Sequence, residues 1–153
     1  SKSLCIVSWK DKAVSPDQFS EATHSGEFHA ESVAQVFVRR RASDGARYGF
    51  HLNPRDKNWE IKLDGVPTAK TRVLVRVPSA GAPSAGDTLR LEIRGRTLRG
   101  FHKGKEVIAA TDESEDRLSA GGAPGMAFFH PGKDFPARIF ASWKGGPLPE
   151  PAK

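Results

Sequence analysis

The sequence predicts an all-β protein, a two-sheet antiparallel β-sandwich. Short segments along the 153-residue chain alternate apolar and polar side chains with a period of two, which places one set on a buried sheet face and the other in water. Turn-forming pairs such as Asp44-Gly45, Asn53-Pro54 and Asp64-Gly65 separate these segments. No segment longer than a few residues has the apolar period of a helix. Many short strands with regular turns are typical of a sandwich or barrel.

The expected strands follow from this alternation, taken in chain order. They are residues 4–9, 19–24, 31–40, 47–53, 59–64, 71–77, 87–94, 97–103, 106–111, 125–129 and 135–143. In the seventh strand, Leu89, Leu91 and Ile93 form the apolar face, with arginine and glutamate between them. A shift of one residue would expose the whole apolar set, so the alternation determines the pairing of the strands.

The length of the chain favours a single domain. We expect this domain to span residues 1–144, and residues 145–153 (GGPLPEPAK) to form a Pro/Gly-rich tail or linker. This ending favours one domain of a larger secreted or cell-surface protein. Cys5 is the single cysteine, which excludes an internal disulfide, and its apolar neighbours predict a buried thiol. No apolar run approaches the roughly 20 residues of a membrane span, and no signal peptide is visible.

The net charge of +6 favours an anionic partner: an acidic or sulfated glycan, nucleic acid or a membrane surface. Arginines occupy many of the predicted outward positions: Arg40, Arg47, Arg72, Arg76, Arg90, Arg94 and Arg99. Arginine is suited to bidentate binding of carboxylate, sulfate or phosphate. The alternative is a solvated face on which arginines pair with Glu60 or Glu92 on neighbouring strands. Nucleic acid ranks below a glycan, because no ribonucleoprotein-type motif with exposed aromatics is present.

Three segments, Gly86–Asp112, Gly121–Phe129 and Phe135–Trp143, resemble the concanavalin A-like lectin/glucanase superfamily. More narrowly, they resemble laminin-G-like jelly rolls and the domains described as 3-keto-disaccharide hydrolases, and the hairpin Ala34–Leu52 adds to this likeness. The resemblance implies a jelly roll with one curved sheet. It also implies ligands on the concave face or on the loops at one rim, with calcium held by rim carboxylates in some members. Such folds host many functions, so activity depends on the site.

The carboxylates of the sequence suggest two further kinds of site. A glycosidase needs two carboxyl groups about 5–10 Å apart, and Glu60 with Glu92 would meet this only if their strands pair. The acidic run Asp112–Asp116 makes calcium possible, although it lacks the EF-hand spacing and favours a plain acidic loop. The sequence has no recognisable nucleophile, phosphate or dinucleotide motif.

These observations predict a non-catalytic, lectin-like module that binds a glycan on a basic sheet face, and the charge favours an anionic glycan. The expected ligand-binding residues are Arg47, His51, Asn53, Arg72, Arg76 and Arg90. Trp9, Trp59 and Trp143 are candidates for stacking on a sugar, but Trp59 is in phase with apolar residues that predict the core. The alternatives are a hydrolase or lyase of the same superfamily, and a protein-interaction domain.

Overall fold

The computed structural model describes residues 3–8, 14–27, 31–65, 71–119, 121–130 and 139–151. Within these ranges the chain forms eleven strands and no helix. The strands are β1 (Ser3–Ser8), β2 (Gln18–His24), β3 (Val33–Arg40), β4 (Arg47–Asn53), β5 (Asn58–Asp64), β6 (Arg72–Pro78), β7 (Thr88–Arg94), β8 (Thr97–His102), β9 (Lys105–Thr111), β10 (Ala123–His130) and β11 (Phe140–Pro147). Each lies within a few residues of an expected strand.

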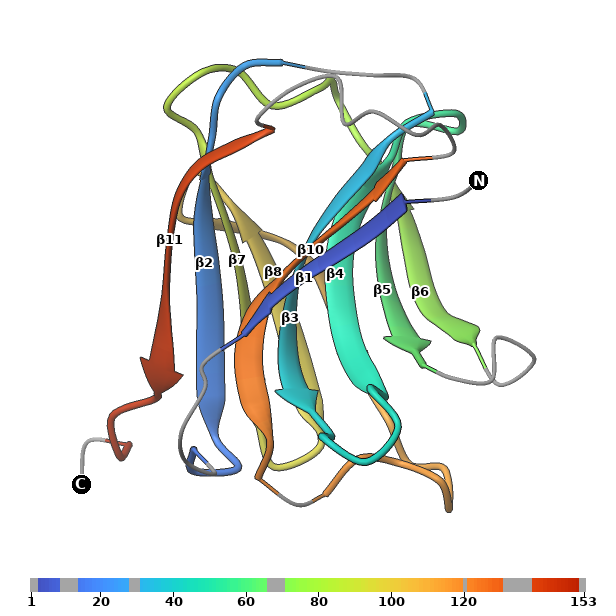
Figure 1. Ribbon diagram of the computed structural model, residues 1–153, viewed down its shortest axis with the longest axis vertical. Coiled ribbons are helices and arrows are strands. Elements are labelled where there is room, and N and C mark those ends of the chain that lie inside the picture. Colours follow the sequence, from blue (N-terminus) through green and yellow to red (C-terminus); the bar gives the residue numbers. More distant parts are fainter. Residues whose placement is uncertain are drawn as a thin grey trace.

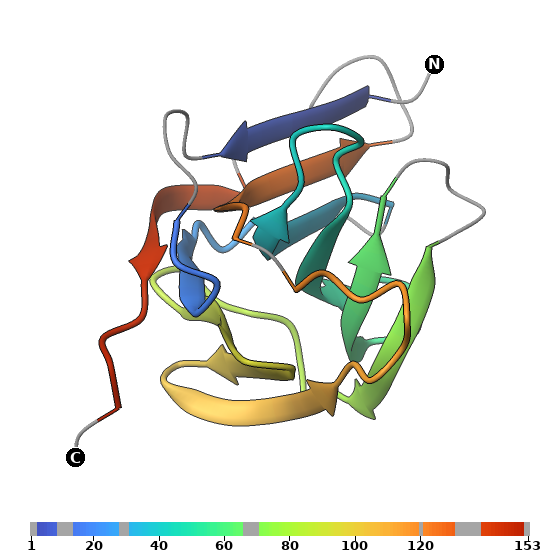
Figure 2. The same ribbon diagram turned by 90° about the horizontal axis from the view of Figure 1, so that it is seen from below.

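The strands form two antiparallel sheets that pack face to face (Figure 1). The six-stranded sheet has the order β1-β10-β3-β4-β5-β6, and the five-stranded sheet has the order β11-β2-β7-β8-β9. The six-stranded sheet is curved, and its concave side faces away from the five-stranded sheet (Figure 2). The predicted two-sheet antiparallel β-sandwich is therefore confirmed.

The core lies between the sheets and consists of the apolar set of each alternating strand. Leu89, Leu91 and Ile93 are all buried, as their spacing predicted. They belong to a cluster that includes Val36, Val38, Tyr48, Phe50, Trp59, Ile61, Leu63, Leu98 and Ile108. Burial of each large apolar side chain contributes roughly 1.5–3 kcal/mol, so this cluster holds the two sheets together. The described part of the chain contains no helix long and apolar enough to cross a membrane.

The last strand extends past the domain boundary expected at residue 144. Gly145, Gly146 and Pro147 continue the pairing of β11 with β2. The next residue, Leu148, is buried and donates its backbone N–H to the carbonyl of Asp17 over 2.9 Å. The strand thus ends inside the segment expected to be a tail, because two glycines do not prevent a strand from pairing at a sheet edge. Residues 135–138 of the expected last strand lie outside the described residues.

The expectation of a buried Cys5 is wrong. Its thiol is exposed, although its strand forms as expected. β1 is the outermost strand of the six-stranded sheet and pairs only with β10. An edge strand has a neighbour on one side only, so a short apolar run does not guarantee burial there.

Candidate functional site

Three neighbouring strands bring polar side chains together on the concave face of the six-stranded sheet. His51 of β4 pairs with Glu60 of β5, and Glu60 pairs with Arg76 of β6. Residues directly opposite each other in a sheet share a face, so these three side chains form a row across the strands. Asn53 and Lys62 stand two residues away on the same face, because alternate residues of a strand point the same way.

Glu60 is the centre of this group. Its Oε1 atom accepts hydrogen bonds from Asn53 Nδ2 at 2.9 Å and from Arg76 Nε at 3.2 Å. Its Oε2 atom lies 3.8 Å from Lys62 Nζ and 3.6 Å from His51 Nε2. We call these five residues the Glu60 cluster. The Glu60 side chain is only 1% exposed, whereas that of Lys62 is 24% exposed and that of Arg76 is 55% exposed. Two cations therefore border a buried carboxylate.

Three buried atoms of the Glu60 cluster lack a hydrogen-bond partner. They are Oε2 of Glu60 and both ring nitrogens of His51. Leaving such a group unsatisfied costs roughly 1–3 kcal/mol, and most buried polar groups in proteins are paired. The contacts of Oε2 with Lys62 and His51 are too long to count as hydrogen bonds. The cluster thus has unused capacity both to accept and to donate hydrogen bonds.

The protonation states follow from burial and from neighbouring charges. Burial lowers the pKa of His51 to about 4, and the positive charge of Lys62 acts in the same direction. Burial acts to raise the pKa of Glu60, but the hydrogen bond from Asn53, the His51 charge and the hydrogen bond from Arg76 together hold that pKa below its usual value. At neutral pH the cluster therefore combines an ionised carboxylate with a neutral imidazole that has one donor and one acceptor.

Arg47 lies on the same face, toward the other end of β4. Its Nε donates to Gln35 Oε1 over 2.7 Å, and its guanidinium lies 5.6 Å from the centre of the Phe37 ring. Gln35 in turn donates to Asp64 over 3.1 Å. The Arg47 side chain is buried and is held by these contacts. It supports the sheet face and does not join the Glu60 cluster.

Arg72 lies on the opposite face of its strand from Arg76. The pairing of β5 with β6 shifts between Ile61 and Lys62, so Leu74 is an extra residue in the register. Such a bulge turns all residues beyond it to the other face. Arg72 is therefore opposite Leu63, and its guanidinium bonds Asp112 and Asp116 at the end of the sandwich. The expectation that Arg72 and Arg76 share a face is wrong for this reason.

Arg90 belongs to the other sheet. It lies on the outer face of the five-stranded sheet, 2.8 Å from Glu92 and 3.6 Å from Glu21, with its guanidinium 4.0 Å from the centre of the Phe19 ring. The six residues expected to bind one ligand thus do not converge. His51, Asn53 and Arg76 meet, Arg47 lies apart on their face, and Arg72 and Arg90 lie elsewhere. The period of two assigns a residue to a face of its strand, but it does not assign the strand to a sheet.

Lys62 was not among the residues predicted from the sequence to bind a ligand, and Glu60 was predicted only as a catalytic or salt-bridging group. Both residues alternate with the core residues Trp59, Ile61 and Leu63, so their outward placement was visible in the sequence. Their meeting with His51 and Asn53 depends on the register between β4 and β5. The turn at Asn53-Pro54 connects the two strands, so it was the feature of the sequence that could have predicted this register.

The tryptophans offer no stacking surface beside the Glu60 cluster in the described part of the chain. Trp59 is in the core, as its phase predicted, with its ring 5.4 Å from that of Phe50. Trp143 is on β11 in the other sheet and donates its indole N–H to Ser20 Oγ over 2.8 Å. Trp9 lies outside the described residues.

The carboxylates that a catalytic pair or a calcium site would use contact other groups. Glu60 and Glu92 lie on different sheets, on faces that point away from each other, which excludes them as a catalytic pair. Asp112 accepts a hydrogen bond from Tyr48 and contacts Arg72, and Asp116 also contacts Arg72. In the described ranges no three His, Cys, Asp or Glu side chains are grouped as metal ligands.

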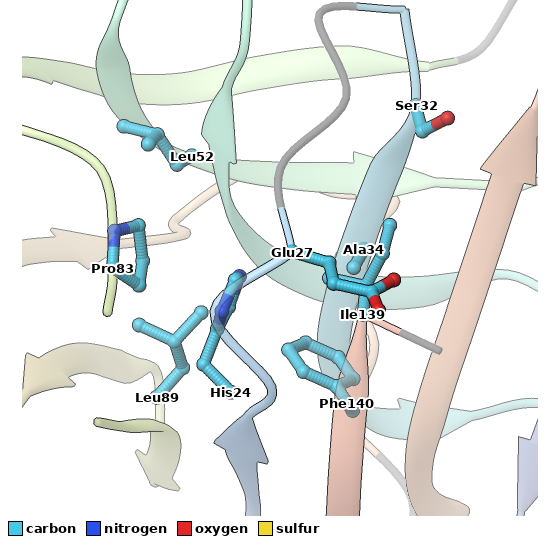
Figure 3. A pocket seen from close by; sticks show the side chains of 9 residues that line it. All are labelled: His24, Glu27, Ser32, Ala34, Leu52, Pro83, Leu89, Ile139 and Phe140. Carbon is cyan, nitrogen blue, oxygen red and sulfur yellow. The ribbon is translucent and has the colours of Figure 1, made fainter. Parts of the chain in front are cut away.

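A small cavity lies between the sheets, and its lining side chains are drawn in Figure 3. Its volume is about 30 Å³, and Leu52, Leu89, His24 and Phe140 are among the side chains around it. Nδ1 of His24 accepts a hydrogen bond from the backbone of Gly26 at 2.9 Å, which places any ring proton on Nε2. A space of this size holds about one water molecule, so it excludes a sugar ring.

Comparisons with known proteins establish the fold. No protein-family model matches the sequence, and no curated protein matches it. Among solved structures, the carbohydrate-binding module CBM66 from Bacillus subtilis has 12% identity and a TM-score of 0.58 over 85% of this chain and 79% of its own. Toad ovary galectin in complex with thio-digalactose has 9% identity and a TM-score of 0.57 over 93% and 97%. A prokaryotic β-1,3-1,4-glucanase from a mouse hindgut metagenome has 12% identity and a TM-score of 0.54 over 82% and 57%.

At these identities the likeness concerns the fold alone. These neighbours are sandwiches of the concanavalin A-like type, and their sheets match the two antiparallel sheets described above. The narrower likeness to laminin-G-like domains stays a prediction. The chain therefore has the concanavalin A-like jelly-roll fold, as the sequence resemblance predicted.

Proposed function

We propose that this protein is a carbohydrate-binding module that binds its glycan at the Glu60 cluster, on the concave face of the six-stranded sheet. The observation that carries this proposal is the set of unsatisfied buried atoms on Glu60 and His51. A functional reason for such atoms is a ligand that completes their hydrogen bonds. The presence of carbohydrate-binding modules and galectins among the fold neighbours supports a saccharide as that ligand.

Sugar hydroxyls match what the Glu60 cluster offers. A hydroxyl donates one hydrogen bond and accepts up to two. Oε2 of Glu60 is buried, so a ligand reaches it when the partly exposed Lys62 side chain moves outward. One hydroxyl can then donate to Oε2 while it accepts from the Lys62 ammonium, which lies 3.8 Å from that oxygen in the free protein. A neighbouring hydroxyl can then bond the neutral ring of His51. A carboxylate beside cations and a neutral imidazole thus fits a polyol better than it fits a purely anionic group.

An acidic saccharide is the finer form of this proposal. Arg76 is the most exposed member of the cluster, and Arg55, also exposed, follows Asn53 in the turn and donates its backbone N–H to Asn53 Oδ1 over 3.0 Å. A uronate or sulfate group would lie toward these guanidiniums at the border of the site, with the hydroxyls over Glu60. Arginine binds such planar or tetrahedral anions with two parallel hydrogen bonds.

The experiment is a screen of the whole chain against neutral and acidic oligosaccharides, followed by calorimetry on the best ligand. We expect Lys62→Met and Arg76→Gln each to weaken binding by about tenfold or more, which corresponds to roughly 1.4 kcal/mol. The matched controls lie on the other sheet. Lys144→Met also removes an ammonium that contacts a glutamate, and Arg99→Gln also removes a half-exposed guanidinium beside one.

The controls are expected to bind as the unchanged protein does. Equal losses in all four variants, or the absence of any bound saccharide, would contradict the proposal. The same ligands test the alternative of a hydrolase or lyase, since turnover would release new reducing ends or unsaturated products. A module that only binds would leave the ligand intact.

A further inference from the structure

A second cavity is bordered by the segment before β2 and by the turn between β7 and β8. That turn lies at the end of the sandwich that faces the viewer in Figure 2. The cavity has a volume of about 270 Å³. The charged side chains around it are Asp17, Arg39, Arg96, Asp112 and Arg117. This volume is large enough for a sulfate or phosphate group or for a single small sugar, in contrast to the water-sized cavity between the sheets.

Arg39 forms a fixed, positively charged wall of this cavity. Its side chain is 3% exposed and lies 3.8 Å from Asp17. Nε donates to the carbonyl of Pro16 over 2.8 Å, and Nη1 donates to that of Leu118 over 2.7 Å, so the guanidinium ties together two loops that border the cavity. Its backbone has a φ of 52°, in the left-handed region that is unfavourable for a residue other than glycine. Strain of this kind is concentrated at functional sites in proteins.

The negative charges around the cavity are partly offset by their neighbours. Asp112 is buried, accepts a hydrogen bond from the Tyr48 hydroxyl at 2.6 Å, and lies 3.1 Å from the guanidinium of Arg72. Asp17 accepts the backbone N–H of Gly95 at 2.9 Å and faces Arg39. Neither carboxylate is therefore left to repel an anion at full strength.

Two guanidiniums at the cavity remain available. In the described part of the chain, Arg96 is exposed and its side chain makes no hydrogen bond or ion pair, and Arg117 donates only to the carbonyl of Ser114, over 2.9 Å. Many other arginines contact a carboxylate: Arg41, Arg72, Arg76, Arg90 and Arg99. Two guanidiniums without a carboxylate partner, beside a third that is buried, are the kind of groups that proteins use to hold an oxyanion.

We propose that this cavity is an oxyanion-binding site, in which Arg96 and Arg117 hold a sulfate, phosphate or carboxylate group against the wall formed by Arg39. The site shares no residue with the Glu60 cluster, so this proposal does not depend on the function proposed above. The group can be a free ion or a substituent of a saccharide, and these two sources are separated by the choice of probe.

The test is a titration of the isotope-labelled whole chain, followed by NMR at constant ionic strength, with sodium sulfate, glucose 6-sulfate and glucose as probes. We expect saturable shifts of the backbone amides of Gly95, Arg96 and residues 117–119 with both sulfated probes and none with glucose. Tighter binding of glucose 6-sulfate than of sulfate would identify a saccharide as the carrier, and equal binding would identify the free ion.

The decisive variant is Arg96→Gln with Arg117→Gln, which should raise the Kd for sulfate by about tenfold or more. Arg41→Gln with Arg99→Gln removes the same number of charges from surface ion pairs and should leave the Kd unchanged. Ser119→Glu, at an exposed position, places a carboxylate at the cavity and should also raise the Kd for sulfate. Shifts that do not saturate, equal losses in the control pair, or full binding by the decisive variant would overturn the proposal.

Discussion

The Oε2 atom of Glu60 and the Nε2 atom of His51 are 3.6 Å apart, and each side chain is only 1% exposed. This separation is too long for a hydrogen bond, so the two groups influence each other by charge while both keep unsatisfied atoms. Burying these two groups without hydrogen-bond partners costs free energy in the free protein. The same unsatisfied atoms can bind the hydroxyls of a ligand. The two consequences, for stability against pH and for ligand binding, are measurable separately.

We expect the protein to lose stability as the pH falls from about 6.5 to about 4. Burial lowers the pKa of His51 from 6.5 to about 4, so in this window the unfolded chain binds the proton and the folded chain does not. Stability then rises with pH, and the loss on acidification is of the order of 3 kcal/mol at about 1.4 kcal/mol per pKa unit. The lowered pKa of Glu60 acts in the same direction below about 4.5. Urea unfolding at a series of pH values measures this.

The matched variant for this prediction is His51→Gln, which keeps a polar side chain but cannot titrate. Its free energy of unfolding should depend less steeply on pH between 6.5 and 4. If the variant and the unchanged protein show the same slope, the buried imidazole is not the source of the pH dependence.

Tyr48→Phe should lower the free energy of unfolding by roughly 1–3 kcal/mol. The Tyr48 hydroxyl donates to Asp112 Oδ2 at 2.6 Å and accepts the backbone N–H of Leu118 at 2.9 Å. Its removal leaves the buried N–H of Leu118 unpaired and takes one donor from Asp112 Oδ2, which keeps its hydrogen bond from Arg72 at 3.1 Å. Denaturant unfolding gives the difference. Thr97→Val is the control, because the hydroxyl it removes faces that of Thr111 at 3.5 Å on the surface, and it should change stability by less than about 0.5 kcal/mol.

Gly100→Ala should destabilise the core by roughly 1–3 kcal/mol, because an added Cβ would lie 2.6 Å from Ile108 Cγ2 and 2.9 Å from Phe50 Cε1. Gly81→Ala tests the effect of the same methyl group where nothing lies within 4 Å. Thermal unfolding of the two variants should show a lowered Tm for the first and little change for the second. A Gly100→Ala protein as stable as the original would refute the close packing of the two sheets at this point.

Cys5 should react with a thiol reagent such as dithionitrobenzoate in the native protein, with one equivalent released without a lag. The thiol is exposed on an edge strand, so no opening of the sandwich is needed. Addition of urea should not increase the yield. Reaction only after unfolding would show that the edge strand is covered in solution.

Much of the fold was predictable because alternation is a local property. Leu89, Leu91 and Ile93 are buried where a period of two places them. Trp59 has the same phase as Ile61 and Leu63 and is buried in the core with them. Cys5 illustrates the limit of this reasoning, since the same kind of apolar run is exposed at a sheet edge. Burial depends on what lies opposite a strand, which is set by partners distant in the sequence.

The candidate site was predictable in part for the same reason. His51 and Asn53 point outward as the alternation of β4 predicts, and Arg76 joins them through the registers of β5 and β6. Arg72 does not, because the extra residue Leu74 reverses the faces of β6 at that point. A bulge of this kind leaves little signal in the sequence, since its neighbours are valines that suit either face.

By itself, the sequence determined the strands, their turns and the apolar set that packs between two sheets, because side-chain alternation and turn chemistry act over a few residues. The tertiary structure alone decided which strands became neighbours and in what register. That order separates Arg90 from Arg76, brings Glu60 against His51, and gathers Arg96 and Arg117 around one cavity. Such contacts join residues far apart in the chain, and they depend on how the sheets pair and pack, which no short stretch of sequence contains.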